Sequence, residues 1–461
     1  MRRFLTLATA LVAVWLVSTP VRTETQPPTQ QILPPEARYW MGVTTGAGIQ
    51  AMGGMSRGGQ PSMADMMRMG MGGGPPSESH QVELRLGSTL PAGPPGPEAF
   101  HTMPPGAQVN QPIFLQTPQG GSSGGDVPTG YRTPKGQITF YWGCGEKAGP
   151  GQPVVLTFDK LLRGESDAEL AALEGAVAAR QVRKPTPGTS KTYGDWPHGD
   201  VQRKNKDLKA TFPTGSTLAG PHVVEGTYSP RIAFTLPEGK SYLDAVRYTS
   251  TGRLPSGSVK VSWAPVNRAT GYALGVMAPE RVNDDSANLV MWSSANRPAT
   301  FLAMEDLTPG EVARLIKLDA VLPPAATDCA VPAEVVKATK TGSMLMFTAY
   351  GDEATFIHPP RPADPATPWD QEWFARVSFK STRMDIISPD GVQDLLGGNP
   401  ATSAASDLPP DASLSDEEYC KALEAKQKQP PAAGGGLRGR LLGRVMGGKK
   451  EEPVDPRCVK K

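Results

Sequence analysis

The chain has 461 residues and a formal net charge of +2, so its overall charge does not indicate a nucleic-acid-binding protein. It contains 51 glycines and 48 prolines, well above the share in ordinary globular chains, and only 38% hydrophobic residues. This composition indicates that much of the chain lies outside a packed core. It predicts a mainly β fold, with one or two β-sandwich-like domains and a few short helices, flanked by a disordered N-terminal leader and a disordered C-terminal tail.

Residues 1–23 have the pattern of an export signal. Arg2 and Arg3 form a positively charged start, and the apolar stretch 5–17 is shorter than the roughly 20 residues that a membrane-spanning helix needs. A good cleavage site does not follow, so an uncleaved inner-membrane anchor stays an alternative. We expect a periplasmic or secreted bacterial protein.

Residues 24–79 are rich in proline, glutamine, glycine and methionine, and we expect them to be disordered. Their methionines are Met41, Met52, Met55, Met63, Met66, Met67, Met69 and Met71. Thioethers are soft ligands that select Cu(I) or Ag(I), and the stretch 52–71 resembles the Met-rich segments of periplasmic copper-resistance proteins, without their companion histidines. The alternative is a low-complexity leader whose methionines are incidental or contact a partner.

Residues 80–220 predict a first β-rich domain. Apolar and polar residues alternate over 82–86, as expected for a strand with one buried face. Two β-rich runs, 137–142 and 153–158, flank a loop of glycine, lysine and proline and predict a hairpin.

The same domain contains a Pro/Gly linker, 88–135, and a predicted helix, 167–182. The linker includes a Gly-x-Ser-x-Gly sequence at 121–125, but a nucleophile elbow needs a strand before it and a helix after it, so we interpret the match as fortuitous. The helix begins with a capping box formed by Ser166 and Glu169.

The cysteine count is even, which in an exported protein predicts disulfides. The candidates are Cys144, Cys329, Cys420 and Cys458. Three pairings are open, and the spacing does not match a zinc ribbon or a thioredoxin-type motif.

Residues 221–397 predict a second β-rich domain. Its strand candidates are 232–236, 259–263, 272–276, 289–292, 344–350 and 373–379. Two short helices are also predicted, one capped by Thr308 and one capped by Ser388, each with proline at its first position.

The stretch SVKVSWAPVNRATGYALGV, residues 258–276, resembles the early strands of fibronectin type III domains. Trp263, Pro265, Ala269 and Tyr272 occupy the positions of that pattern. The resemblance implies an immunoglobulin-like sandwich with Trp263 and Tyr272 as core aromatics, and it implies no specific activity.

Two acidic clusters have alternative interpretations. Asp195, His198 and Asp200 could hold a cation or simply form a turn. Asp370 and Glu372, placed on one strand face between two tryptophans, have the residue types of a glycoside-cleaving pair, although such pairs usually come from different strands. Solvated acids beside core tryptophans are the alternative.

Residues 398–461 predict a helix that starts at Ser415, followed by a basic, Gly-rich disordered tail. The tail has the charge to contact an anionic membrane surface, and a solvated tail is the alternative.

These patterns together predict an exported bacterial cell-envelope protein that is not an enzyme and that binds or scaffolds an envelope protein or surface. The first alternative is a periplasmic Cu(I)- or Ag(I)-binding protein that uses the Met-rich segment. The second is a secreted hydrolase that acts on carbohydrate. Apart from Cu(I), no cofactor is expected, and nucleic acid is not an expected partner.

Overall fold

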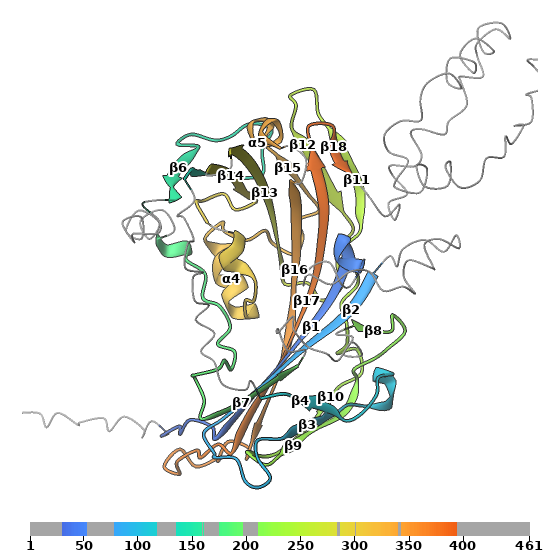
Figure 1. Ribbon diagram of the computed structural model, residues 1–461, viewed down its shortest axis with the longest axis vertical. Helices are drawn as coiled ribbons and strands as arrows, with labels where there is room; N and C mark the ends of the chain where they lie inside the picture. The colour runs from blue at the N-terminus through green and yellow to red at the C-terminus, as the bar shows by residue number, and fades with distance from the viewer. Residues whose placement is uncertain are drawn as a thin grey trace, which may run out of the picture.

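The structure is a computed structural model that describes residues 30–52, 78–117, 135–158, 160, 175–196, 211–283, 286–299, 301–339 and 343–393. The predictions for the export signal, the tail, Cys420 and Cys458 lie outside these residues, as do those for most of the Met-rich segment. Within them the fold is mainly β, as predicted, and Figure 1 shows long strands that run the length of the molecule.

The largest element is an eleven-stranded main sheet with the order β6-β5-β14-β13-β16-β17-β1-β2-β7, to which β8 and β18 add at β2 and β17. Its strands are β1 (Ala37–Gly48), β2 (Glu78–Ser88), β5 (Gln137–Trp142), β6 (Val154–Thr157), β7 (Thr192–Trp196), β8 (Thr211–Phe212), β13 (Gly271–Asn283), β14 (Ser286–Ser293), β16 (Met344–His358), β17 (Trp373–Ser388) and β18 (Gly391–Gln393). β1 pairs in parallel with β17, and β14 pairs in parallel with β5.

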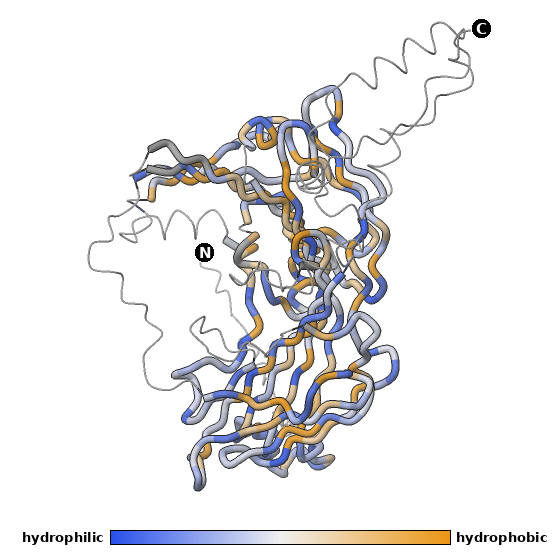
Figure 2. Tube along the Cα trace, turned by 45° about the vertical axis from the view of Figure 1, so that its right-hand side comes forward, coloured by the Kyte–Doolittle hydropathy of each residue, from blue (hydrophilic) through white to orange (hydrophobic). Residues whose placement is uncertain are grey.

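The two faces of the main sheet differ. Along the 16 residues of β17, buried and half-buried side chains alternate without interruption, because successive side chains of a strand point to opposite faces. The buried set includes Ala375, Val377 and Phe379. Figure 2 shows hydrophobic and polar residues alternating along the strands.

Two smaller sheets cover the buried face, which we call the inner face. One has the order β10-β9-β3-β4, from β3 (Ala99–Thr102), β4 (Ile113–Leu115), β9 (Gly220–Gly226) and β10 (Ser229–Leu236); the other has the order β11-β12-β15, from β11 (Tyr248–Arg253), β12 (Val259–Trp263) and β15 (Asp328–Val331). Their apolar residues form one hydrophobic core with the inner face of the main sheet. A 3-10 turn, η3 (Pro105–Ala107), and a short helix, α5 (Ala333–Ala338), complete this side.

The opposite face, which we call the open face, carries α4 (Pro309–Lys317) and three 3-10 turns: η1 (Ile49–Met52), η4 (Gly175–Val177) and η5 (Phe301–Met304). Thr308 caps α4 as predicted, since its Oγ1 accepts a hydrogen bond from the Glu311 N–H at 3.1 Å. Val312 and Leu315 of the helix form a second, smaller core with Tyr350 of β16. This core covers only part of the open face.

One disulfide joins the main sheet to the three-stranded sheet. Cys144, in the turn after β5, is bonded to Cys329 of β15, with Cα atoms 5.0 Å apart. The same turn is held by a hydrogen bond from the Gly145 N–H to the Ala330 carbonyl. Of the predicted cysteine candidates, these two therefore form a pair.

The predicted domain limits need correction. β1, inside the segment 24–79 that was predicted to be disordered, lies between β17 and β2 and is almost completely buried. The predicted linker 88–135 contains β3 and β4. The main sheet takes strands from both sides of residue 220, so the predicted boundary there does not separate two sheets.

Two helix predictions were wrong within the described residues. The helix 167–182 does not continue past η4: the Val182 N–H bonds to the Asp306 carbonyl, and Gln181 forms a β-bridge to Leu307, so this backbone is paired with another segment. The helix predicted at Ser388 is a tight turn between β17 and β18. Pro-Asp-Gly is itself a turn sequence, and Gly391 adopts a φ of 118° that favours glycine.

The strand predictions around Trp263 and Tyr272 are confirmed, although the two residues belong to different sheets. Both side chains are buried, and their rings meet edge to face with centroids 5.6 Å apart. Their predicted place as core aromatics is therefore confirmed, while the resemblance to fibronectin type III domains stays a prediction.

Candidate functional site

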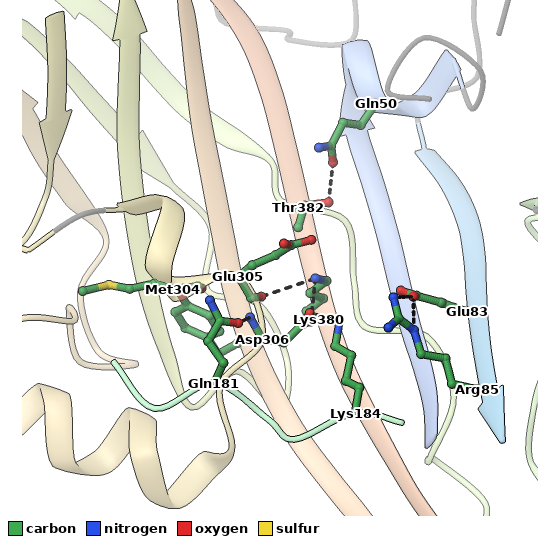
Figure 3. A network of polar contacts seen from close by, with 11 residues as sticks. Gln50, Glu83, Arg85, Gln181, Lys184, Met304, Glu305, Asp306, Lys380 and Thr382 are labelled. Carbon is green, nitrogen blue, oxygen red and sulfur yellow. Dashed lines mark hydrogen bonds and ion pairs between the residues drawn. The ribbon is translucent and has the colours of Figure 1, made fainter. Parts of the chain in front are cut away.

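A groove of about 330 Å³ lies on the open face, over β1, β2, β16 and β17 and beside η5. Its polar lining includes Thr44, Gln50, Gln81, Glu83, Glu305 and Lys380. Figure 3 shows these strands and the segment that follows η5 facing each other across the groove. Because most of the lining side chains stand on strands of the main sheet, their positions are fixed by the sheet.

Asp306 is not itself a lining residue, but it holds Lys380, which lines the groove. Its carboxylate accepts a hydrogen bond from the Lys380 Nζ at 2.8 Å and also pairs with the Lys184 Nζ. Its backbone N–H donates to the Gln181 Oε1 at 3.2 Å. Burial raises the pKa of Asp306, but the two ammonium groups lower it further, so the net pKa lies below its ordinary value.

Trp40 lines the end of the groove that is nearest the start of β1. Its indole ring folds back over Gly42, where a Cβ atom would lie 2.2 Å from the ring. The Lys184 ammonium lies 4.3 Å from the ring centroid, in cation–π contact. Nearby, the guanidinium of Arg85 donates to the Glu83 carboxylate through its Nε at 2.7 Å. Trp40 is thus a covered structural residue, not a surface for stacking a ligand.

The other end of the groove, nearest η1, is lined by amide, hydroxyl and thioether groups, with the Glu305 carboxylate close to Thr382 (Figure 3). The Thr382 hydroxyl donates to the Gln50 Oε1 and ties η1 to β17 (Figure 3). Met346 and Met384, which are directly opposite each other on β16 and β17, line the same end. The groove therefore offers ammonium, carboxylate, amide, hydroxyl and thioether groups along one path.

A second cavity, of about 570 Å³, opens near the start of β2 and is lined by Glu78, His80, Tyr242 and Arg247 among others. The His80 ring stacks on Tyr242 with centroids 3.8 Å apart, and its Nδ1 lies 3.3 Å from the Pro213 carbonyl. Burial is the main cause of a lowered pKa for His80. These contacts show that the His80 ring is used in packing. We therefore favour the groove over this second cavity as the candidate site.

Two further histidines form a buried chain between the sheets. The His222 Nε2–H donates to the Leu218 carbonyl at 2.7 Å, because a carbonyl only accepts. Its Nδ1 therefore accepts from the His101 Nε2–H at 3.0 Å, and the His101 Nδ1 accepts from the Tyr39 hydroxyl at 2.8 Å. Every ring nitrogen is used, and both imidazoles are neutral in this arrangement.

Those of the singled-out residues that the structure describes are not brought together in one site. Met52 ends η1, whereas Met55, Met63, Met66, Met67, Met69 and Met71 lie outside the described residues. Met41, which precedes the Met-rich segment, is buried on the inner face. Asp195 lies in β7, where the Tyr193 hydroxyl donates to it at 3.2 Å; its predicted companions His198 and Asp200 lie outside the described residues.

The predicted pair Asp370 and Glu372 is not on a strand face. Both side chains are exposed in the loop that precedes β17, and the Glu372 carboxylate lies 3.8 Å from the His358 Nε2. Trp373 is buried and stacks on His358, while the Trp369 indole N–H donates to the Pro359 carbonyl. The tryptophans here are used in packing. Neither acid lines the groove.

The groove was missed from the sequence because its residues come from five separate segments. An alternating pattern shows that Gln81, Glu83 and Lys380 leave the core, but not that they meet. Among the described residues, moreover, no group of three or more His, Cys, Asp or Glu side chains is arranged to hold a metal ion.

The fold and groove define a mainly β protein whose main sheet is covered on one face by two smaller sheets and carries an open groove on the other. No protein-family model, no curated protein and no solved structure matches the chain. In the part of the chain that the structure describes, no helix is both long enough and apolar enough to cross a membrane.

Proposed function

We propose that this is an exported, non-catalytic binding protein of the bacterial cell envelope, and that its groove holds an extended segment of a partner envelope protein. The observation that supports the proposal is the groove itself: about 330 Å³ of open space with mixed polar and thioether groups set on rigid strands. The envelope location rests on the export-signal pattern of residues 1–23.

A polypeptide suits this lining better than a single small charged ligand. Of the charged lining residues, Lys380 is paired with Asp306 and Glu83 is paired with Arg85, so these charges are already largely neutralised. Amide and hydroxyl groups at Gln50, Gln81 and Thr44 remain suited to a peptide backbone. Methionine side chains adapt to apolar side chains of varied shape.

The exposed carboxylate of Glu305 gives the proposal a charge preference. It stands at the edge of the groove and extends beyond the Asp306 ion pairs (Figure 3). We therefore expect the bound segment to place a lysine or arginine beside Glu305. An exposed ion pair of this kind adds specificity and only a modest share of the affinity.

The proposal is tested by placing a photo-crosslinking amino acid at residue 44, 305 or 238 of the full-length protein in the cells that produce it. Residues 44 and 305 line the groove, whereas Glu238 is exposed elsewhere and serves as the control. We expect one partner segment to crosslink at both groove positions and not at the control.

A synthetic peptide of that segment is then titrated calorimetrically. Thr44→Arg, which fills the groove, is expected to weaken binding at least 10-fold. Glu305→Lys is expected to weaken it about 3- to 5-fold, a change that corresponds to the modest energy of an exposed ion pair. The charge-matched control Glu238→Lys should change nothing. Crosslinks that are equally frequent at all three positions, or a peptide that binds Thr44→Arg normally, would rule the groove out.

A further inference from the structure

Methionines gather on the open face of the main sheet. Outside the Met-rich segment, the described methionines other than Met41 and Met103 belong to this region of the fold: Met277, Met291, Met304, Met344, Met346 and Met384. The sequence does not reveal this grouping, because the six residues are spread over more than 100 positions.

Strand register places five of them in one row. Met291 is directly opposite Met277, Met277 is directly opposite Met344, and Met346 is directly opposite Met384. Directly opposite residues share a face, and so do residues two apart on one strand, as Met344 and Met346 are. The methionine row therefore crosses four adjacent strands, β14, β13, β16 and β17.

The row is accessible where it reaches β16 and β17. Met344, Met346 and Met384 are half-buried, while the intervening Leu345 is completely buried on the inner face. Met346 and Met384 also line the groove. Met304 is different: its side chain is buried and points away from Lys380 in Figure 3, so we leave it out of the site.

We propose that Met344, Met346 and Met384 form a binding site for a soft monovalent cation, Cu(I) or Ag(I). Opposite residues on antiparallel strands have Cβ atoms about 5 Å apart, and the three rotatable bonds of methionine let two sulfurs converge on an ion at about 2.3 Å. Met344, two residues along β16, supplies the third thioether of a trigonal set.

The surroundings favour a soft ion over a hard one. The neighbouring groups at this end of the groove are the neutral side chains of Gln50, Thr348 and Thr382 and the single carboxylate of Glu305. Asp385, next in sequence to Met384, is buried on the inner face and held by two hydrogen bonds from Arg383 at 2.8 and 3.0 Å. Hard cations, which need several carboxylate oxygens, would find a single carboxylate among these described side chains, whereas a soft cation finds three thioethers.

The metal-site proposal does not require the peptide proposal to be right, although Met346 and Met384 line the same groove. It is also distinct from the Met-rich segment of the sequence prediction, which begins at the end of η1. Gln50 of η1 is bonded to Thr382, two residues from Met384, so the described start of that segment lies beside the methionine row.

The test is an anaerobic titration of the full-length protein with Cu(I) against a competing Cu(I) chelator, in a background where the six methionines from Met55 to Met71 are leucine. We expect one Cu(I) per chain to remain bound. The double variant Met346→Leu/Met384→Leu should weaken that binding at least 100-fold, whereas the control Met41→Leu/Met103→Leu should leave it unchanged. Leucine conserves volume, so the folds should be preserved.

A second measurement does not depend on the variants folding. Ag(I) added to protein with ¹³C-labelled methionine methyl groups should shift the resonances of Met344, Met346 and Met384 and leave those of Met41 and Met103 in place. If the leucine background binds no Cu(I), if the double variant binds it normally, or if the three methyl resonances do not move, the row is only an adaptable apolar surface and the proposal is wrong.

Discussion

Two buried histidines connect the main sheet to the four-stranded sheet. His101 of β3 and His222 of β9 complete a hydrogen-bonded chain that starts at Tyr39 of β1. Burial lowers the pKa of His222 to about 4 and lowers the pKa of His101 well below its ordinary value, with the neighbouring His222 as a second cause. Since all ring nitrogens are used by the neutral forms, protonation must break the chain.

This arrangement predicts a loss of stability in mild acid. The unfolded chain takes up a proton on each histidine near pH 6.5, while the folded protein keeps His222 neutral down to about pH 4. The free energy of unfolding should therefore fall as the pH drops from 6.5 to 4, by about 1.4 kcal/mol per pH unit for His222 and about 3 kcal/mol over the window, and His101 adds to the fall.

Urea unfolding at pH 7.5, 6.0 and 5.0 measures this slope in the wild type and in His222→Gln. Glutamine offers a donor and an acceptor but does not titrate, so the slope should be smaller in the variant. Equal slopes in the two proteins would mean that His222 is not held neutral by the fold.

At the scale of elements, η5, which lines one side of the groove, packs closely on the main sheet because the residue beneath it is a glycine. Phe301 of η5 lies directly over Gly275 of β13, where a Cβ atom would be 2.5 Å from the Phe301 Cγ. Gly275→Ala should therefore push η5 away from the sheet and lower the free energy of unfolding by about 1–3 kcal/mol, the usual cost of overpacking.

The matched control is Gly252→Ala in β11, where an added Cβ meets nothing within 4 Å, and its expected effect is within about 0.5 kcal/mol. In a Phe301→Ala background, the cost of Gly275→Ala should largely disappear, which chemical denaturation can measure as a double-mutant cycle. An undiminished cost in that background would show that Phe301 is not what the added methyl group meets.

Local patterns predicted the elements whose exposure alternates. β12 was predicted with its observed limits, and β17 with its observed start, because one face of each is buried; α4 was predicted from its cap and first proline. β1 was missed because it is buried on both faces and interrupted by glycines, one of which is covered by Trp40. A strand of that kind has no alternation to detect.

The candidate sites depend on pairings between distant strands, which a single sequence does not contain. The alternation of Met344 and Met346 with Leu345 was visible, but their meeting with Met384 depends on the register of β16 and β17. The sequence instead drew attention to the Met-rich segment, where spacing along the chain is all that a motif can use. Cys144 and Cys329 were two of four disulfide candidates because the cysteine count is even, and only the fold selects their pairing.

At the scale of the whole molecule, strands from before and after residue 220 alternate in the main sheet. β17 pairs with β1, and β14 pairs with β5. The Cys144–Cys329 bond closes a loop with a sequence separation of 185 residues across the same division. The inner core is likewise shared, with Val43 and Val82 packed in the same cluster as Val377.

The second predicted domain should therefore not fold alone. A chain of residues 221–393 keeps β16 and β17 but loses β1, which leaves the apolar inner side chains of β17 without their neighbours and one edge of that long strand unpaired. We expect it to show no cooperative thermal transition and no near-ultraviolet circular dichroism, whereas residues 30–393 should unfold in one transition. Co-expression with residues 30–220 should restore that transition by supplying β1, β2 and β5 in trans. If the isolated 221–393 chain unfolds cooperatively, the main sheet is divisible at residue 220, and the two-domain organisation predicted from the sequence would be right after all.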